Sequence, residues 1–306
     1  DGDKRGVNPD ERIFFYDDGE NWWSRGGGLD KTPIGDPCGP DSEVFYDFGP
    51  ENHDASFGLA HPASDSGQFM EIGNQVFMQY RRNEDGSFSL LDRKNVDFGG
   101  GLERIVAAAD NDPDVFNISL LSPIITQLEK SSGKKYVDNT EDMRVIADHL
   151  RAATMLVYDG VIPSNKEQGY VLRRLVRRAV RYALSLGIEQ NFLGDTIPVI
   201  TNIYSDDFAA LKEKASEIVQ ILEKEERAFR QTLNKGLNKL NELGDVEITG
   251  ADIFTLYDTY GFPLELSVEE IKRQKLPLDE NWHTQYNEKR EEQREKSRAA
   301  MKKVRA

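Results

Sequence analysis

The sequence predicts an α+β protein in which a strand-rich first part is followed by a mainly helical second part. Residues 1–106 are rich in glycine, aspartate, asparagine and aromatic residues and contain short strand-like runs, which favours antiparallel sheet and long loops. From about residue 107 onward the apolar residues recur at helical spacing instead. We therefore expect a first domain over residues 1–130 and a helical domain over residues 131–306.

The strand-rich part contains one clear hairpin. Residues 69–80 alternate as a long strand, residues 83–87 form the turn, and residues 88–91 begin the return toward Val96 and Asp97. A shorter apolar run at residues 12–16 predicts an earlier strand. Together these runs indicate an antiparallel sheet.

Asn74 differs from its neighbours in the hairpin. Alternation places it on one face with apolar residues such as Ile72 and Val76, while Glu71 falls on the other face. Burying an unpaired amide costs about 1–3 kcal/mol. Asn74 therefore needs a partner, which is either a small polar ligand or a neighbouring backbone group.

Three glycines, Gly99, Gly100 and Gly101, end the second strand of the hairpin and open a helix that carries Arg104 in its first turns. Glycines let a ligand approach the backbone closely, and a helix N-terminus presents free N–H groups to an anion. Arg104 can form two hydrogen bonds with phosphate oxygens. The pattern predicts a polyanion site, with a packing or bulge role for the glycines as the alternative.

The second part is expected to contain several helices. Their predicted positions are residues 143–158, 170–186, 206–243, 251–256 and 267–274, with a charged tail at 287–306. Residues 138–141 are a candidate cap of the first of these helices, and Gly169 precedes the second. The long helix has a scaffold stripe at steps of three and four: Ile218, Leu222, Glu225, Phe229, Leu233, Gly236 and Leu240.

Five arginines share one side of the helix at 170–186. They are Arg173, Arg174, Arg177, Arg178 and Arg181, and apolar residues occupy the opposite side. In an acidic chain, a concentrated row of cations is a candidate track for a phosphate backbone. The alternative is a set of salt bridges to acidic residues of neighbouring helices, and individual arginines can serve both purposes.

The overall charge argues against non-specific binding of nucleic acid. The chain has 54 acidic and 39 basic side chains and a net charge of −15, so any contact with RNA must be local. One cysteine and four scattered histidines provide no disulfide framework and no zinc-ligand spacing. No apolar run is long enough to span a membrane, and we expect a monomeric cytoplasmic protein.

Several blocks of sequence resemble the alanyl-tRNA synthetase family of class II, and they follow the family's order over nearly the whole chain. The blocks are residues 21–23, 37–40, 42–43, 45–47, 71–79, 96–104, 147–151, 163–165, 169–174 and 256–263. The resemblance implies the C-terminal half of a class II antiparallel-sheet catalytic domain followed by a helical tRNA-recognition domain. Because two further class II motifs and the editing domain are not among these residues, we expect a fragment.

The resemblance also implies roles for individual residues. It suggests that alanine is bound by Trp23, Asn74, Val76 and Asp97, and ATP by Gly99, Gly100, Gly101 and Arg104. Arg104 and Glu71 would be catalytic, with Glu71 near the magnesium that accompanies ATP. In the helical domain, Asn165 and Asp258 match the pair that meets a G·U wobble pair in the tRNA acceptor stem, with the five arginines as further tRNA contacts. Without the family, we would interpret Asn165 as a helix cap and Asp258 as a turn residue.

One residue of the glycine block departs from the family's usual sequence. Phe98 stands where threonine is common, and a bulky ring there could alter the nucleotide pocket. The expected function is that of an alanine–tRNA ligase acting on ATP, L-alanine and the tRNA-Ala acceptor stem, as a fragment inactive alone. The alternatives are an acceptor-stem-binding module without catalytic activity and a purely structural helical interaction protein.

Overall fold

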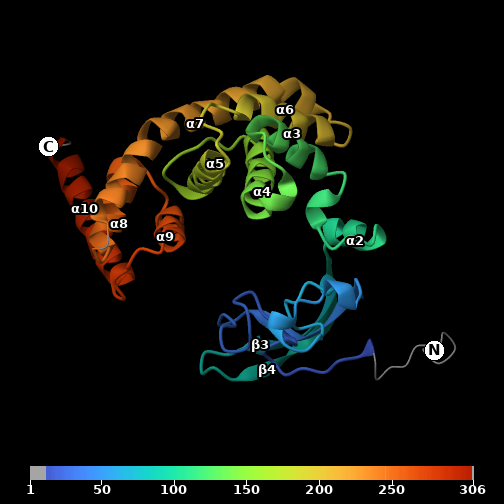
Figure 1. Ribbon diagram of the computed structural model, residues 1–306. Helices are drawn as coiled ribbons and strands as arrows, with labels where there is room; N and C mark the ends of the chain where they lie inside the picture. The colour runs from blue at the N-terminus through green and yellow to red at the C-terminus, as the bar shows by residue number, and fades with distance from the viewer. Residues whose placement is uncertain (1–11, 245, 305–306) are drawn as a thin grey trace. The chain divides into compact units, whose positions relative to one another are not determined.

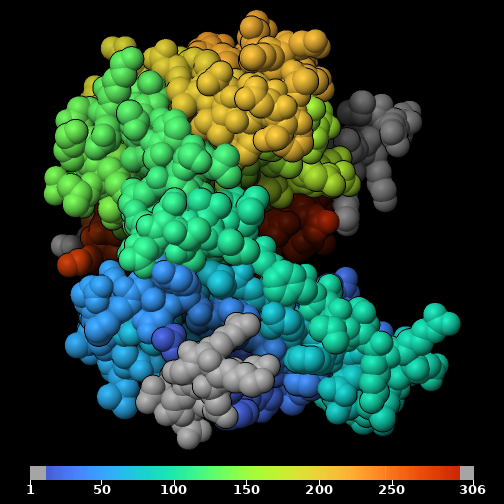
Figure 2. Space-filling view, turned by 90° about the vertical axis from the view of Figure 1, so that its right-hand side faces the viewer, coloured from blue at the N-terminus to red at the C-terminus, as the bar shows by residue number. Residues whose placement is uncertain are grey.

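The structure is a computed structural model that describes residues 12–244 and 246–304. The chain divides into two compact units, one ending at Leu120 and the other beginning at Leu121. The first is coloured blue to teal and the second green to red in Figures 1 and 2. This division falls ten residues before the expected boundary after residue 130, and the assignment of the two functional domains stays a prediction.

The first unit contains an antiparallel sheet with the strand order β1-β2-β3-β4, followed by a helix, as the α+β prediction requires. The elements are β1 (Trp22–Trp23), β2 (Pro37–Asp47), β3 (Phe69–Arg82), β4 (Phe88–Gly100) and α2 (Leu102–Ala109). The predicted hairpin is β3–β4. The expected strand at residues 12–16 is wrong, because residues 13–16 are irregular and none of the described strands pairs with them.

Two features of the sheet position the candidate site. A register shift between Val44 and Phe45 places Phe45 opposite Glu71, so Ile72 is the extra residue of a bulge in β3. β4 is hydrogen-bonded to β3 along one edge, and its side chains from Asp92 to Gly100 are exposed. The outer strand of this end of the sheet is therefore accessible, whereas Val76 on the neighbouring strand β3 is buried.

The second unit is helical. Its helices are α3 (Ser122–Ser132), α4 (Thr140–Tyr158), α5 (Glu167–Ser185), α6 (Leu193–Tyr204), α7 (Ala210–Leu243), α8 (Gly250–Tyr260), α9 (Leu264–Arg273) and α10 (Trp282–Val304). Helix α7 spans the unit, from α6 at one end to α8 at the other (Figure 1). The apolar stripe of α7 is buried as predicted, with Phe229 at 0% exposure and Leu233 at 1%.

The helix ends show one error of sequence interpretation. Asn139 is the N-cap of α4, but its side chain makes no capping bond; its Nδ2 donates to the carbonyl of Lys135, which precedes the helix. α3 and α6 were not predicted. Among the described helices, none combines the length and the apolar character needed to cross a bilayer.

Candidate active site and nucleic-acid interface

Three predicted alanine-site residues share one face of the sheet. Cross-strand partners point to the same side, and the register gives two adjacent rows, one of Asp41, Val76 and Asp97 and the other of Glu43, Asn74 and Gly99. Val76 is 6% exposed, whereas Asp97 lies on the exposed strand β4. The structure therefore brings Asn74, Val76 and Asp97 together beside two further carboxylates.

The partners of Asn74 are side chains rather than backbone. Its Nδ2 donates to Oδ2 of Asp41 at 3.0 Å and to Oε1 of Glu43 at 3.1 Å. Oδ1 of Asn74 and Oδ1 of Asp41 are buried and have no hydrogen-bond partner in the described part of the chain. Because an unmet buried acceptor is unfavourable, this face fits a ligand that donates hydrogen bonds.

Glu71 lies on the same side of the sheet as Glu43, which alternation alone does not predict. The bulge at Ile72 puts Glu71 opposite Phe45, two residues after Glu43 on β2. Burial, and then the charges of Glu71 and Asp41, raise the pKa of Glu43. The face therefore carries a cluster of carboxylates, which suits a cationic group.

Glu71 and Arg104 form a pair at the start of α2. Nη1 of Arg104 is 2.9 Å from Oε2 of Glu71 and 3.1 Å from its carbonyl oxygen. The Arg104 side chain is 50% exposed, so the guanidinium has donors left for an anion. The two predicted catalytic residues are thus in contact.

The three glycines have different surroundings. Gly101 is the N-cap of α2, and its N–H donates to the carbonyl of Ile72. A Cβ at Gly99 would meet open space, on the side of Asn74, whereas a Cβ at Gly100 would lie 3.2 Å from the Phe98 ring. Phe98 therefore covers Gly100 on the face opposite Asn74. An effect of this ring on a nucleotide pocket stays a prediction.

Trp23 is not part of the two rows. It pairs with Gly39 at the edge strand β1 and is 37% exposed, while Trp22 stacks against Tyr80 at 5.8 Å. A pocket of about 560 Å³ adjoins the carboxylates Asp41 and Glu43 and is lined also by residues 12–16. Neither Asn74 nor Asp97 lines this pocket.

In the helical unit, Asn165 and Asp258 line the same pocket although they are far apart in sequence. We name it the recognition pocket after the role predicted for these two residues. It has a volume of about 360 Å³, and Arg173, Arg174 and Arg177 line it as well. Both Asn165 and Asp258 are exposed. The chain thus brings the two predicted base-reading residues together with three of the five predicted arginines.

Local structure excludes the two alternative interpretations of these residues. The N-cap of α5 is Lys166, without a side-chain cap bond, so Asn165 is not the cap. Asp258 lies within α8 rather than in the turn at Gly261. Gly169 allows the segment before α5 to lie against the helix, since a Cβ there would come within 2.5 Å of the Ile162 carbonyl oxygen.

All five arginines of α5 have acidic partners. Arg173 and Arg177 pair with Glu225 of α7, at 3.2 and 2.7 Å. Arg174 pairs with Glu265 at 2.8 Å, Arg178 with Glu269 at 2.8 Å, and Arg181 with Glu270 at 2.5 Å. The five arginines therefore form the salt bridges that were the alternative to a phosphate-binding role. A role in tRNA binding stays a proposal.

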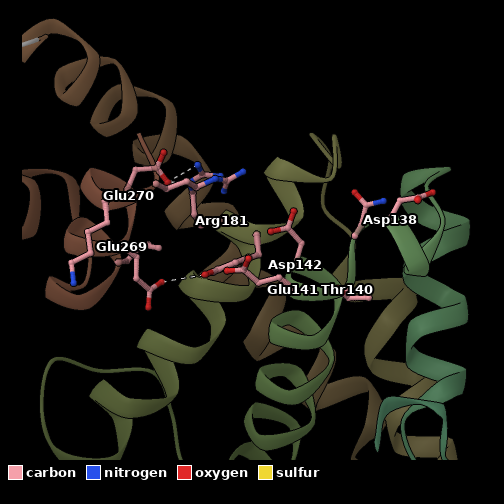
Figure 3. A pocket seen from close by; sticks show the side chains of 12 residues that line it. Asp138, Thr140, Glu141, Asp142, Arg181, Glu269 and Glu270 are labelled. Atoms are coloured by element: carbon pink, nitrogen blue, oxygen red, sulfur yellow. Dashed lines mark hydrogen bonds and ion pairs between the residues drawn. The ribbon is translucent and has the colours of Figure 1, made fainter. Parts of the chain in front are cut away.

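Arg181 faces a different pocket from Asn165. It lines a pocket of about 710 Å³ with Asp142 at the start of α4 and with Glu270 (Figure 3). Its side chain is 9% exposed, and that of Glu270 is 4% exposed. Arg181 therefore contributes to packing between α5 and α9, not to the recognition pocket.

Sequence reasoning placed Glu225 only in the scaffold stripe of α7 and gave no site role to Asp41 and Glu43. Glu225 was detectable, because it is a charged residue within the apolar stripe of α7 and a buried charge needs partners. Asp41 and Glu43 become partners of Asn74 only through the strand register. Among the described residues, no three His, Cys, Asp or Glu side chains are placed to hold a metal ion.

Comparison with known proteins identifies the family. The model of the family "tRNA synthetases class II (A)" matches residues 3–306. The chain belongs to the class II (A) tRNA synthetases.

Within this family, the chain is similar to curated alanine–tRNA ligases. It is 40% identical to those of Halalkalibacterium halodurans and Bacillus subtilis, over 97% of this chain and 34% of each relative. It is 38% identical to that of Geobacillus kaustophilus, over 97% of this chain and 33% of the relative. This class II (A) synthetase chain therefore spans about a third of the length of the curated relatives that it matches.

Proposed function

We propose that this chain is part of an alanine–tRNA ligase, which activates L-alanine with ATP and transfers it to tRNA-Ala. The observation that carries the proposal is the recognition pocket, in which Asn165 and Asp258 lie together with three arginines. The match to the class II (A) family and to alanine–tRNA ligases supports it. The two sites of the chain then have separate tasks.

The face of the sheet with Asn74 and Asp97 is the proposed alanine site. Asp97 would pair with the substrate ammonium, and the unmet Oδ1 of Asn74 would accept a hydrogen bond. One methyl group contributes only about 1 kcal/mol when buried. Selection of alanine therefore depends on steric limits such as Val76, which is almost fully buried between Asp41 and Asp97.

The pair of Arg104 and Glu71 is the proposed contact with ATP. Arg104 is half-exposed at the N-terminus of α2 and would donate to phosphate oxygens, where it stabilises negative charge on the leaving pyrophosphate. Protein sites often hold Mg²⁺ through one or two carboxylates together with substrate phosphates, without a complete protein cage. Glu71, beside Glu43, fits that arrangement.

The recognition pocket is the proposed contact with the acceptor stem. Arginine has only donors, so Oδ1 of Asn165 accepts the hydrogen bond from Arg173, and Nδ2 stays available to donate to RNA. Asp258 supplies acceptors, which suit the guanine 2-amino group in the wide minor groove of A-form RNA. The three arginines bring guanidinium donors to the pocket, although Glu225 and Glu265 already pair with them.

The test is the binding of short acceptor-stem hairpins, with a G·U or a G·C pair at the third position, to the 306-residue chain. We expect Asn165→Ala and Asp258→Ala each to reduce the preference for G·U by about 1–3 kcal/mol. The control is Arg227→Ala, since Arg227 is exposed, pairs with Glu223 and does not line the pocket. Folded variants that keep the wild-type preference would refute the assignment of the pair.

A second candidate function is an acceptor-stem-binding module without catalytic activity. The observation that favours it is that one pocket of the helical unit contains both predicted base-reading residues and three arginines. In the sheet, by contrast, strand β4 is exposed along the ligand face. Alanine-dependent exchange of pyrophosphate into ATP distinguishes the two functions. If the protein prefers the G·U hairpin but no form of it catalyses this exchange, the result would favour the binding module.

A further inference from the structure

A buried glutamate of α7 contacts both sides of the recognition pocket through two arginines of α5. Glu225 is 7% exposed, and its Oε1 lies 2.7 Å from Nη2 of Arg177 and 3.2 Å from Nε of Arg173. Arg173 in turn donates to Oδ1 of Asn165, and Arg177 donates to the carbonyl of Gly261. One carboxylate thereby connects Asn165 with the turn that ends α8.

The two arginines need this carboxylate to remain where they are. They lie four residues apart on α5, a spacing at which like charges repel. Glu225 neutralises one of the two guanidinium charges, so the three side chains together carry one net positive charge beside the pocket. Burial lowers the pKa of Arg177, and the adjacent Glu225 opposes that effect.

Packing prevents Arg177 from moving freely. Its Cζ lies 5.2 Å from the centroid of the Phe229 ring, and Phe229 contacts the Phe262 ring edge-on at 5.6 Å. Gly261, with a φ of 69°, leaves room for the guanidinium where a Cβ would be 2.4 Å from Nη1. The position of the Gly261 turn is therefore coupled to Arg177, and through it to Glu225.

We propose that Glu225 is a positioning residue for recognition of the acceptor stem. It holds Arg173 and Arg177, and these arginines fix Asn165 and the end of α8, which carries Asp258, as two walls of one pocket. This role rests on the proposed function of the recognition pocket. Without the carboxylate the two guanidiniums repel each other, and Asp258 is the next acid in the pocket that can attract them.

The variant is Glu225→Gln, and the matched control is Glu226→Gln. Glu226 is the next residue of α7 and is fully buried, but it pairs with Arg230 at 2.9 Å and accepts bonds from the backbone of Phe192 and Leu193. It contacts α6 and its preceding loop instead of the recognition pocket. The control therefore measures the effect of neutralising a buried glutamate of the same helix.

The first readout is hydrogen–deuterium exchange of the 306-residue chain without RNA. We expect the amides of residues 161–168 and 257–263 to exchange at least about tenfold faster in Glu225→Gln than in wild type. In Glu226→Gln their exchange rates should equal those of wild type. Glu225→Asp, which keeps the charge, should restore most of the protection. Unchanged exchange at both segments in Glu225→Gln would overturn the proposal, whatever the RNA measurements give.

The second readout is the preference for the G·U hairpin. Glu225→Gln should reduce it by about tenfold, corresponding to the loss of one base-edge contact. In the Asn165→Ala, Asp258→Ala background the same substitution should change the preference no further. An additional loss of equal size there would overturn the positioning role. A wild type that binds both hairpins alike would refute discrimination by the recognition pocket at the binding step, while exchange still decides whether Glu225 holds the pocket walls.

Discussion

Substituting Gly261 by alanine should destabilise the helical unit through two separable effects. Gly261 ends α8 in the left-handed region, with φ 69° and ψ 24°, and alanine in that region costs about 1–2 kcal/mol. Its new Cβ would also lie 2.4 Å from Nη1 of Arg177. Glu225 and the Phe229 ring hold that guanidinium, so the clash adds an overpacking cost of about 1–3 kcal/mol.

Gly133 provides a matched comparison for the backbone effect. It follows α3 in the same left-handed region, with φ 70° and ψ 8°, and a Cβ there would have no heavy atom within 4 Å. We expect the free energy of unfolding to fall by about 1–2 kcal/mol in Gly133→Ala and by about 2–5 kcal/mol in Gly261→Ala. The difference between the two variants isolates the contact with Arg177.

The assay is urea unfolding followed by circular dichroism at 222 nm, which reports mainly the helical unit. The free energy of unfolding is compared between variants with similar slopes, because the chain has two compact units and need not unfold in one step. Equal losses for Gly261→Ala and Gly133→Ala would refute the reasoning. That result would mean that Arg177 rearranges without cost.

Three further predictions concern catalysis, RNA and pH. The 306-residue chain alone should not exchange pyrophosphate into ATP at an enzyme-like rate; exchange well above that of Asp97→Ala would contradict this. Arg174→Ala should weaken the binding of G·U and G·C hairpins equally and reduce the salt dependence of binding by roughly one counterion, measured by titration at several salt concentrations. A hydrogen bond from His149 holds the pKa of Asp148 below its usual value, so the stability that Asp148 contributes is present above its unfolded pKa of about 3.9 and is lost as pH falls through the lower folded pKa. Asp148→Asn should therefore show a shallower loss of stability than wild type below about pH 4, and parallel acid unfolding curves would contradict this.

Local patterns were sufficient for much of the fold. The alternation at residues 69–80 and the turn after it predicted the β3–β4 hairpin, because period-two alternation and a short polar turn are properties of adjacent residues. The stripe of α7 predicted its buried face for the same reason. The prediction of a strand at residues 12–16 was wrong, since a strand requires a partner that local sequence cannot specify.

Features that depend on distant contacts were decided by tertiary structure. The bulge at Ile72 determines that Glu71 shares a side with Glu43, and alternation alone predicts the opposite. The arginine row of α5 was evident from its spacing, but whether guanidiniums face RNA or acids depends on where α7 and α9 pack. The sequence by itself determined which helix carries the charges and which residues resemble a tRNA-reading pair. Only tertiary structure placed that pair, Asn165 and Asp258, in one pocket with Glu225 behind it, because hydrogen bonds and ion pairs between distant segments depend on packing.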